Sequence, residues 1–238
     1  MDRFIRKVLI FAAALSLMAG AASAATLSTR LELDPSALEI TDEGLILFDE
    51  EGMNQTEYLG FPSLPYRVIS LLLPQGEDVI DFRVEGGLPV ELAASISLAP
   101  FEGDLFDDGV RRGMHISPEE AVGGDGLFPA WTVRHTGTSA WRGFRIATFE
   151  IYPLKYNAAA GRLTLMEGMT LLVDTAPSDR DRHARRERYI EGFREQSLSA
   201  VLRTVDNPSL ASGYVFDDIR VEPATREFLP SYVPGMEG

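Results

Sequence analysis

The sequence predicts an all-β protein, an antiparallel β-sandwich followed by a charged amphipathic helix and an irregular tail. Three observations lead to this prediction. Apolar and polar residues alternate over several segments of strand length, proline and glycine separate these segments, and apolar residues recur at helical spacing in the stretch after residue 177. With 238 residues and 45% hydrophobic content, the chain is long enough to bury a substantial core.

The first 24 residues have the pattern of an export signal. Arg3, Arg6 and Lys7 precede an apolar run, and small residues lead up to Ala24, after which we expect cleavage. A membrane anchor is the alternative, but the run from Val8 to Ala22 is shorter than the roughly 18 residues that a span needs. We therefore expect export to the periplasm, the cell surface or the medium, and no embedding in the membrane after signal removal.

Composition narrows the classes of partner and chemistry. The formal charge is −14, and removal of residues 1–24 takes away three basic residues and one acidic residue, which leaves about −16. A surface of this sign repels nucleic acid and anionic membranes, so neither is an expected partner. The chain contains no cysteine, which excludes both disulfides and a thiolate nucleophile.

The strands are predicted in chain order, beginning with short edge strands at residues 27–33 and 45–48. Pro62 and Pro65 then stiffen the entry to an apolar strand at residues 68–73. After this strand, the sequence Pro-Gln-Gly has the pattern of a type I turn, and an alternating strand follows. This combination predicts a β-hairpin.

Beyond this hairpin, Gly86 to Pro89 predicts another turn, followed by a strand over residues 90–98. Residues 100–129 lack periodicity, and a connection this long is either functional or mobile. Strands are predicted again at residues 131–135 and 143–152 and, after turn chemistry at Asn157, on the return from Gly161. That last strand places apolar residues on one face: Leu163, Leu165, Met169, Leu171 and Val173.

The chain therefore divides into a signal peptide (1–24), a sandwich domain (25–176), a charged linker with a helix (177–206) and a tail (207–238). We expect the helix to run from about Ala184 to Thr204. The tail is either irregular or the start of a truncated next domain, and the sequence around Gly238 favours truncation.

Two segments carry a resemblance to a known family. The first has Gly-x-Pro-x-Leu-Pro from Gly60, an apolar strand and Pro-x-Gly from Pro74. The second has Arg-Gly at 142–143, a long strand, Pro-x-x-Tyr-Asn from Pro153 and Gly-x-Leu from Gly161. In order and spacing, the pair resembles the propeptide domain that precedes the catalytic domain of gingipain-type cysteine peptidases, over about residues 27–175.

The resemblance implies a β-sandwich that assists folding of the peptidase domain, keeps it latent by covering its cleft, and is cut away on activation. The family's catalytic histidine and cysteine lie in a downstream domain, so we expect this chain to be non-catalytic. Its expected partner is a peptidase catalytic domain, in cis in a longer precursor or in trans. The alternative is an exported β-sandwich that acts as a binding or adhesion module without any link to a peptidase.

Two groups of arginines are candidate sites for this role. Arg111 and Arg112 lie in a glycine-flanked stretch, and an exposed basic residue there suits the acidic pocket of a peptidase that prefers arginine. The alternative is an ordinary solvated pair. The second group is a charged run that is the candidate region for activation cleavage: Arg180, Arg182, Arg185, Arg186 and Arg188. The alternative is that this run is the solvated start of a helix.

Other chemistry has weaker support in the sequence. A hydrolase would need a pair such as Ser139 and His135, but no nucleophile motif surrounds them. We expect no cofactor, with calcium as a weak possibility at four aspartates that do not match the spacing of an EF-hand: Asp104, Asp107, Asp108 and Asp125.

Overall fold

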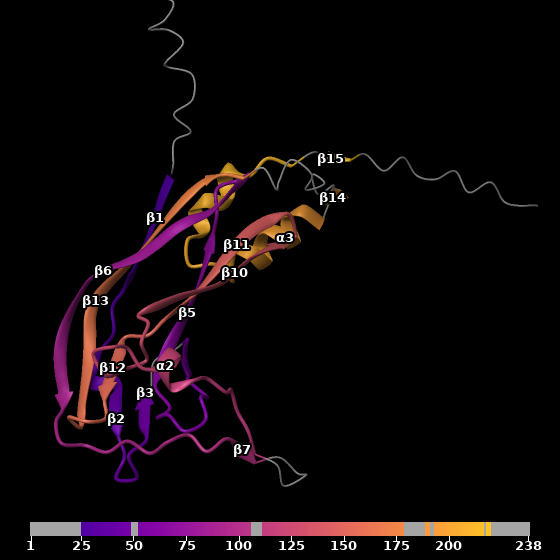
Figure 1. Cartoon of the computed structure of the whole chain (residues 1–238). Helices are drawn as coiled ribbons and strands as arrows, with labels where there is room; N and C mark the ends of the chain where they lie inside the picture. Colours follow the sequence, from indigo (N-terminus) through magenta and orange to yellow (C-terminus); the bar gives the residue numbers. More distant parts are fainter. Residues whose placement is uncertain are drawn as a thin grey trace, which may run out of the picture.

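Two antiparallel sheets face each other in the computed structural model, which describes residues 25–48, 52–105, 111–178, 189–190, 193–216 and 218–219 (Figure 1). Sheet 1 has the order β1-β13-β12-β9, with β6 also paired to β13. Its strands are β1 (Ala25–Leu31), β6 (Glu77–Ala93), β9 (Leu127–Phe128), β12 (Leu154–Asn157) and β13 (Arg162–Pro177). Sheet 2 has the order β10-β11-β5-β4, with strands β4 (Met53–Gln55), β5 (Pro65–Leu72), β10 (Val133–Trp141) and β11 (Phe144–Ile151). The predicted all-β sandwich is confirmed.

Short elements surround the two sheets. Among the described residues they comprise three small strand pairs and four helical turns or helices. The strand pairs are β2 (Leu38–Ile40) with β3 (Ile46–Phe48), β7 (Asp104–Leu105) with β8 (Arg111–Arg112), and β14 (Tyr189–Ile190) with β15 (Asp218–Ile219). The helices are η1 (Pro35–Ala37), α2 (Pro118–Ala121), α3 (Phe193–Leu202) and η3 (Pro208–Gly213).

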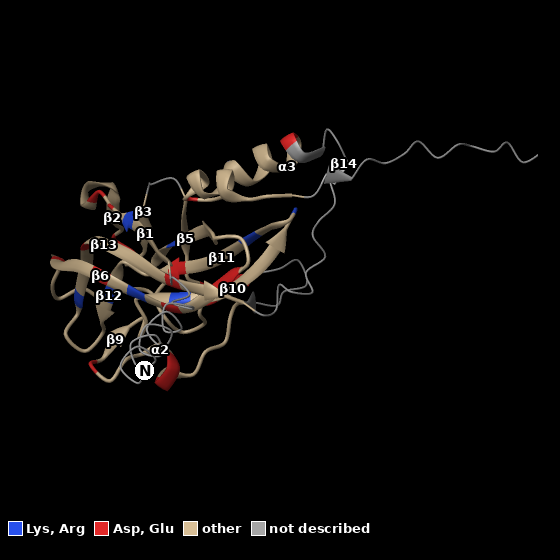
Figure 2. Ribbon diagram, turned by 90° about the horizontal axis from the view of Figure 1, so that it is seen from above, with Lys and Arg blue, Asp and Glu red and all other residues tan. Residues whose placement is uncertain are grey.

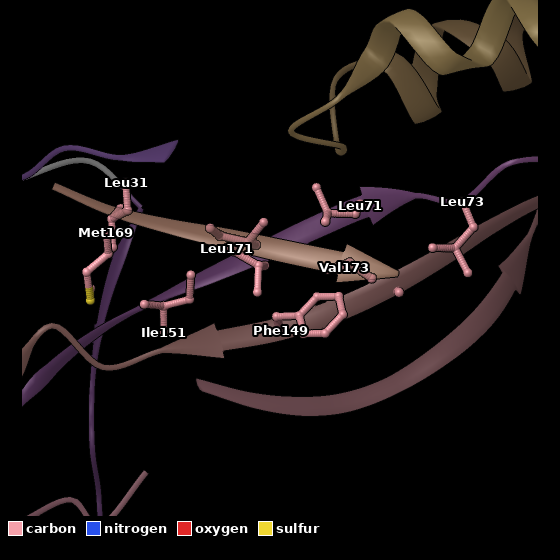
Figure 3. Packing of buried hydrophobic residues seen from close by; sticks show 10 residues of the cluster. Leu31, Leu71, Leu73, Phe149, Ile151, Met169, Leu171 and Val173 are labelled. Carbon is pink, nitrogen blue, oxygen red and sulfur yellow. The ribbon is translucent and has the colours of Figure 1, made fainter. Parts of the chain in front are cut away.

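The core between the sheets follows from the alternation of apolar residues along the strands, which in β13 is interrupted only at Glu167. The five apolar residues predicted on one face of β13 are all at most 1% exposed. Met169, Leu171 and Val173 meet the inward residues of β5 and β11 in Figure 3, among them Leu71 and Phe149. Leu163 and Leu165 pack in a second cluster with Leu154 and Tyr156. Arg145 on β11 adds an ion pair across the sheets, with its Nη2 2.6 Å from Oδ2 of Asp78 on β6. Buried apolar surface therefore holds the two sheets face to face.

The predicted turn between β12 and β13 is also confirmed. Asn157 Oδ1 accepts a hydrogen bond from the backbone N–H of Ala160 at 3.0 Å, and Gly161 adopts a φ of +58°. An added Cβ at Gly161 would lie 2.8 Å from the carbonyl oxygen of Ile96, so the turn needs glycine for conformation and for space.

The predicted hairpin between β5 and β6 is wrong. β5 pairs with β11 in sheet 2, whereas β6 pairs with β13 in sheet 1. The turn itself forms, since the N–H of Glu77 donates to the carbonyl oxygen of Pro74 at 3.1 Å, but it carries the chain from one sheet to the other. The sequence pattern of a turn is local. It does not specify whether the two strands on either side of the turn pair with each other or with other strands.

The predicted turn at Gly86 to Pro89 is wrong as well, because β6 runs through it. Gly86 and Gly87 have φ values of +76° and +82° and lie opposite Gly168, whose φ is +66°. An added Cβ at Gly86 would lie 2.8 Å from the carbonyl oxygen of Gly168. Both strands thus bend together at glycines, and β6 continues to Ala93.

The C-terminal segment also differs from expectation. The helix begins at Phe193 and ends at Leu202, and Tyr189–Ile190 form strand β14, so the predicted helix from Ala184 starts too early. The stretch after residue 207 is partly regular, since it contains η3. Figures 1 and 2 show α3 beside sheet 2, on the side away from β6. There, α3 and η3 cover a third apolar cluster: Leu72, Phe144, Ile146, Val201, Val205, Ala211 and Tyr214.

Candidate functional site

The arginine pair lies on a projecting hairpin. Leu105 pairs with Arg111 and Asp104 with Arg112 in an antiparallel arrangement, and the residues between 105 and 111 lie outside the described part. In Figure 1, β7 stands at the opposite end of the molecule from α3. The stretch predicted as an aperiodic connection therefore contains a small strand pair of its own, with Arg111 and Arg112 on β8, outside the two main sheets.

The base of this hairpin is attached to residues 57–61, which lead into the Gly-x-Pro-x-Leu-Pro segment. The N–H of Phe101 donates to the carbonyl oxygen of Phe61 at 2.7 Å. The N–H of Gly60 donates to the carbonyl oxygen of Phe101 at 2.9 Å. On the returning arm, the N–H of Met114 donates to the carbonyl oxygen of Glu57 at 2.8 Å. Both arms are thus fixed to one short segment, which leads directly into the prolines that brace β5.

Gly113 shows how closely the hairpin and this segment pack. An added Cβ at Gly113 would lie 2.8 Å from Cδ2 of Leu59 and 2.9 Å from Cε1 of Phe101. Only glycine fits between these side chains without displacing them. The sequence pattern identified the glycine-flanked arginines, but the attachment of their loop to residues 57–62 is not visible in the sequence.

A pocket of about 280 Å³ opens beside the hairpin base. Met114, two residues after Arg112, forms part of its wall. The other lining residues come from sheet 2 and from the residues that follow β4 and β11: Thr56, Tyr58, Tyr66, Arg134, His135, Thr136, Glu150 and Tyr152. Sequence analysis missed this pocket because its walls come from five separate segments.

The charged groups of the pocket have partners within it. Arg134 Nη1 donates to the hydroxyl oxygen of Tyr58 at 2.6 Å, and its guanidinium lies 4.8 Å from the ring centre of Trp131. Tyr152 donates its hydroxyl to Oε2 of Glu150 at 2.6 Å. Burial, and then the hydrogen bond to Glu150, raise the pKa of Tyr152 far above its ordinary value, so this phenol stays protonated. The pocket therefore combines aromatic walls with one guanidinium and one carboxylate, which is chemistry suited to binding.

Lys155 is the most deeply buried cation of the described residues. Its Nζ donates to the carbonyl oxygens of Pro129 at 2.8 Å and Trp131 at 2.6 Å, and the residue is 7% exposed. Burial lowers the pKa of Lys155 to about 8, and the charge of Asp125 acts in the opposite direction. Lys155 ties the segment before β10 to β12.

The residues considered for hydrolysis lie in different environments. His135 stacks on Phe149 at 4.8 Å, and its Nε2 lies 3.2 Å from Oγ1 of Thr138. Ser139 is exposed and pairs with Ile146, beyond a register shift in β10 that follows His135. The structure therefore does not bring His135 and Ser139 together as a pair.

The aspartates considered for calcium are also separated in the described part of the chain. Asp104 lies on β7, whereas Asp125 Oδ1 accepts a hydrogen bond from the N–H of Leu127 at 3.1 Å in the turn before β9. Asp107 and Asp108 lie outside the described residues. Within the described ranges, the structure holds no group of three or more histidine or acidic side chains placed to bind a metal ion.

The remaining predicted sites lie outside the described residues. These are the signal cleavage position at Ala24 and the arginine run from Arg180 to Arg188. Within the described residues, no helix has the length and apolar character required to cross a membrane.

Neither a protein-family model nor a curated protein matches the sequence. Among solved structures, the chain is similar to a complex of the pro- and mature domains of RgpB from Porphyromonas gingivalis, at 16% identity and a TM-score of 0.48, with 68% of this chain and 83% of that chain covered. It is also similar to a structure that concerns the zymogenic latency of gingipain K from the same organism, at 18% identity and a TM-score of 0.41, with 64% and 100% covered. These structural neighbours are gingipain pro-domain structures.

Proposed function

We propose that this chain is the exported pro-domain of a gingipain-type cysteine peptidase, which assists folding of the catalytic domain and keeps it latent. One observation carries the proposal: the two segments that resemble the family interleave strand by strand. β5 of the first pairs with β11 of the second in sheet 2, and β6 pairs with β13 in sheet 1. Segments 60–85 and 141–175 thus form one folding unit, as a single pro-domain requires.

The position of the arginine hairpin supports a direct role in latency. The hairpin leaves the sandwich at one end, and its two arms are fixed to residues 57–61, where the first of the two resembling segments begins. In this proposal Arg111 or Arg112 enters the specificity pocket of a peptidase that prefers arginine, where a guanidinium forms bidentate hydrogen bonds with a carboxylate. Activation follows cleavage in the region of Arg180 to Arg188.

An inhibition assay with a matched control tests the proposal. The chain is titrated against the catalytic domains of gingipain-type peptidases that cleave after arginine, with a fluorogenic peptide as substrate. We expect inhibition by the wild type and a loss of about tenfold or more in affinity for the double variant Arg111→Ala, Arg112→Ala. The control, Arg30→Ala with Arg162→Ala, removes the same charge from two exposed surface ion pairs and retains inhibition.

Two outcomes count against the proposal. Inhibition that is equal in the wild type and the arginine-hairpin variant removes the hairpin from the mechanism. Absence of inhibition and of binding across all such peptidases contradicts the pro-domain function itself and favours the binding or adhesion module.

A further inference from the structure

We propose that residues 193–216 form a strap that sheet 2 binds non-covalently, so that the strap stays in place when the chain is cut between residues 178 and 193. The binding surface is the open edge of β5 together with the outer face of sheet 2, and its occupant is this segment of the chain. The inference does not depend on whether the chain covers a peptidase.

β5 has a free edge over its second half. One edge pairs with β11 over residues 67–72, but the other pairs with β4 only over residues 65–67. In an isolated sheet, the N–H and C=O groups of Ser70 and Leu72 on that edge would face solvent or another strand. This edge is the first part of the surface that the strap covers.

Two consecutive residues of the strap satisfy these backbone groups. Asp206 accepts a hydrogen bond from the N–H of Ser70 through Oδ2 at 2.7 Å and donates its own N–H to the carbonyl oxygen of Ser70 at 2.8 Å. Asn207 accepts from the N–H of Leu72 through Oδ1 at 2.7 Å and donates through Nδ2 to the carbonyl oxygen of Leu72 at 2.9 Å. The pair thus replaces a neighbouring strand, and the hydrogen bond to the carboxylate is charge-assisted.

The contact continues along the chain after β5. Gln75 and Val215 exchange two hydrogen bonds. Nε2 of Gln75 donates to the carbonyl oxygen of Val215 at 2.8 Å, and the N–H of Val215 donates to Oε1 of Gln75 at 2.9 Å. Tyr214 donates its hydroxyl to the carbonyl oxygen of Leu73 at 2.6 Å and accepts from the N–H of Arg145 at 3.2 Å. The strap therefore follows the β5 edge and the turn beyond it with specific hydrogen bonds.

Apolar packing forms the second part of the surface. Leu72, Phe144 and Ile146 point to the outer face of sheet 2, and each is at most 6% exposed because α3, η3 and the residues around them cover the face. The ring of Phe144 lies 4.8 Å from that of Tyr214 and 5.1 Å from that of Phe216. Removal of the strap would expose this patch and the β5 edge together, which favours rebinding over separation.

A chain with a specific protease site tests the inference without any peptidase partner. Residues 182–188 are replaced by the recognition sequence of a site-specific protease, and the purified protein is cut to completion and passed over a sizing column. We expect the two fragments to co-elute and the amides of Ser70 and Leu72 to stay protected from hydrogen exchange. Fragments that separate under native conditions overturn the proposal.

Variants of the strap show whether its hydrogen bonds to the β5 edge hold it in place after the chain is cut. In the cut protein, Asp206→Ala with Asn207→Ala is expected to weaken binding of the strap about tenfold or more and to speed exchange at Ser70 and Leu72. The control, Ser212→Ala, removes a hydroxyl that bonds only to Ser209 within η3 among the described contacts, and it leaves binding unchanged. Equal binding by the double variant and the control contradicts the edge contact.

Discussion

Replacement of Phe149 by alanine is expected to lower the free energy of unfolding by about 3–5 kcal/mol. Phe149 is completely buried on β11 of sheet 2, and its ring lies 5.5 Å from that of Phe82 on β6 of sheet 1. The substitution therefore leaves a cavity at the centre of the interface between the sheets, where Figure 3 shows the side chains converging. Urea denaturation of the two proteins measures the difference.

Leu88→Ala is the matched control for this substitution. Leu88 lies on β6 but is 74% exposed, so its truncation is expected to change the free energy of unfolding by less than about 1 kcal/mol. If Phe149→Ala costs no more than Leu88→Ala, the two sheets are not held together by this core, and the sandwich description is wrong.

Stability is expected to rise between pH 8 and pH 10 because of Lys155. Burial lowers the pKa of Lys155 to about 8 in the folded chain, whereas an unfolded lysine titrates near about 10.4. Between these values the unfolded state binds a proton that the folded state has released, so the free energy of unfolding increases with pH by about 2–3 kcal/mol in total. Below the folded pKa, this residue adds no further pH dependence.

A variant without the amine isolates this contribution from other titrating groups. The free energy of unfolding of the wild type minus that of Lys155→Met is expected to increase over the same pH interval. If this difference does not change with pH, Lys155 does not titrate with a lowered pKa in the folded chain. Lys155 is also the only lysine after residue 24. In protein that lacks residues 1–24 and is labelled at the lysine Cε, a single resonance therefore reports the pKa of Lys155 directly by NMR titration.

The sequence predicted those parts of the fold whose causes are local. The alternation from Leu163 to Val173 and the turn chemistry at Asn157 identified β13 and its connection to β12 correctly. The turn at Pro74 was recognised too, but the partner of each strand around it was not. Pairing depends on which distant strands share a core, and no residue within the turn carries that information.

The glycines at 86 and 87 led to a wrong prediction of a turn, because in the structure they allow two strands to approach each other closely. Gly86 and Gly87 have the composition of a turn, yet they allow β6 to bend alongside Gly168. In the same way, Asp206 and Asn207 lie between the predicted end of the helix at about Thr204 and Pro208, a position that indicates only the end of a helix. Their hydrogen bonds to β5 connect residues 135 or 136 positions apart, and no local pattern indicates them.

Only part of the candidate site was predicted, because its residues show a local pattern but its surroundings depend on distant contacts. Arg111 and Arg112 stood out by their charge and flanking glycines. The anchoring of their hairpin to residues 57–62 and the neighbouring pocket arise from contacts between segments that are far apart in the sequence. Charge identified the residues, while backbone pairing determined where they lie.

Reaction of the catalytic cysteine with an irreversible active-site probe tests the pro-domain account most directly. The catalytic domain of a gingipain-type peptidase is incubated with the probe, alone or with an excess of this chain, and the rate of labelling is measured. Coverage of the cleft predicts that the chain slows labelling about tenfold or more, and that Arg111→Ala with Arg112→Ala restores the rate. An unchanged rate of labelling in a mixture where the two proteins form a stable complex would contradict the account, because the chain would then bind away from the cleft.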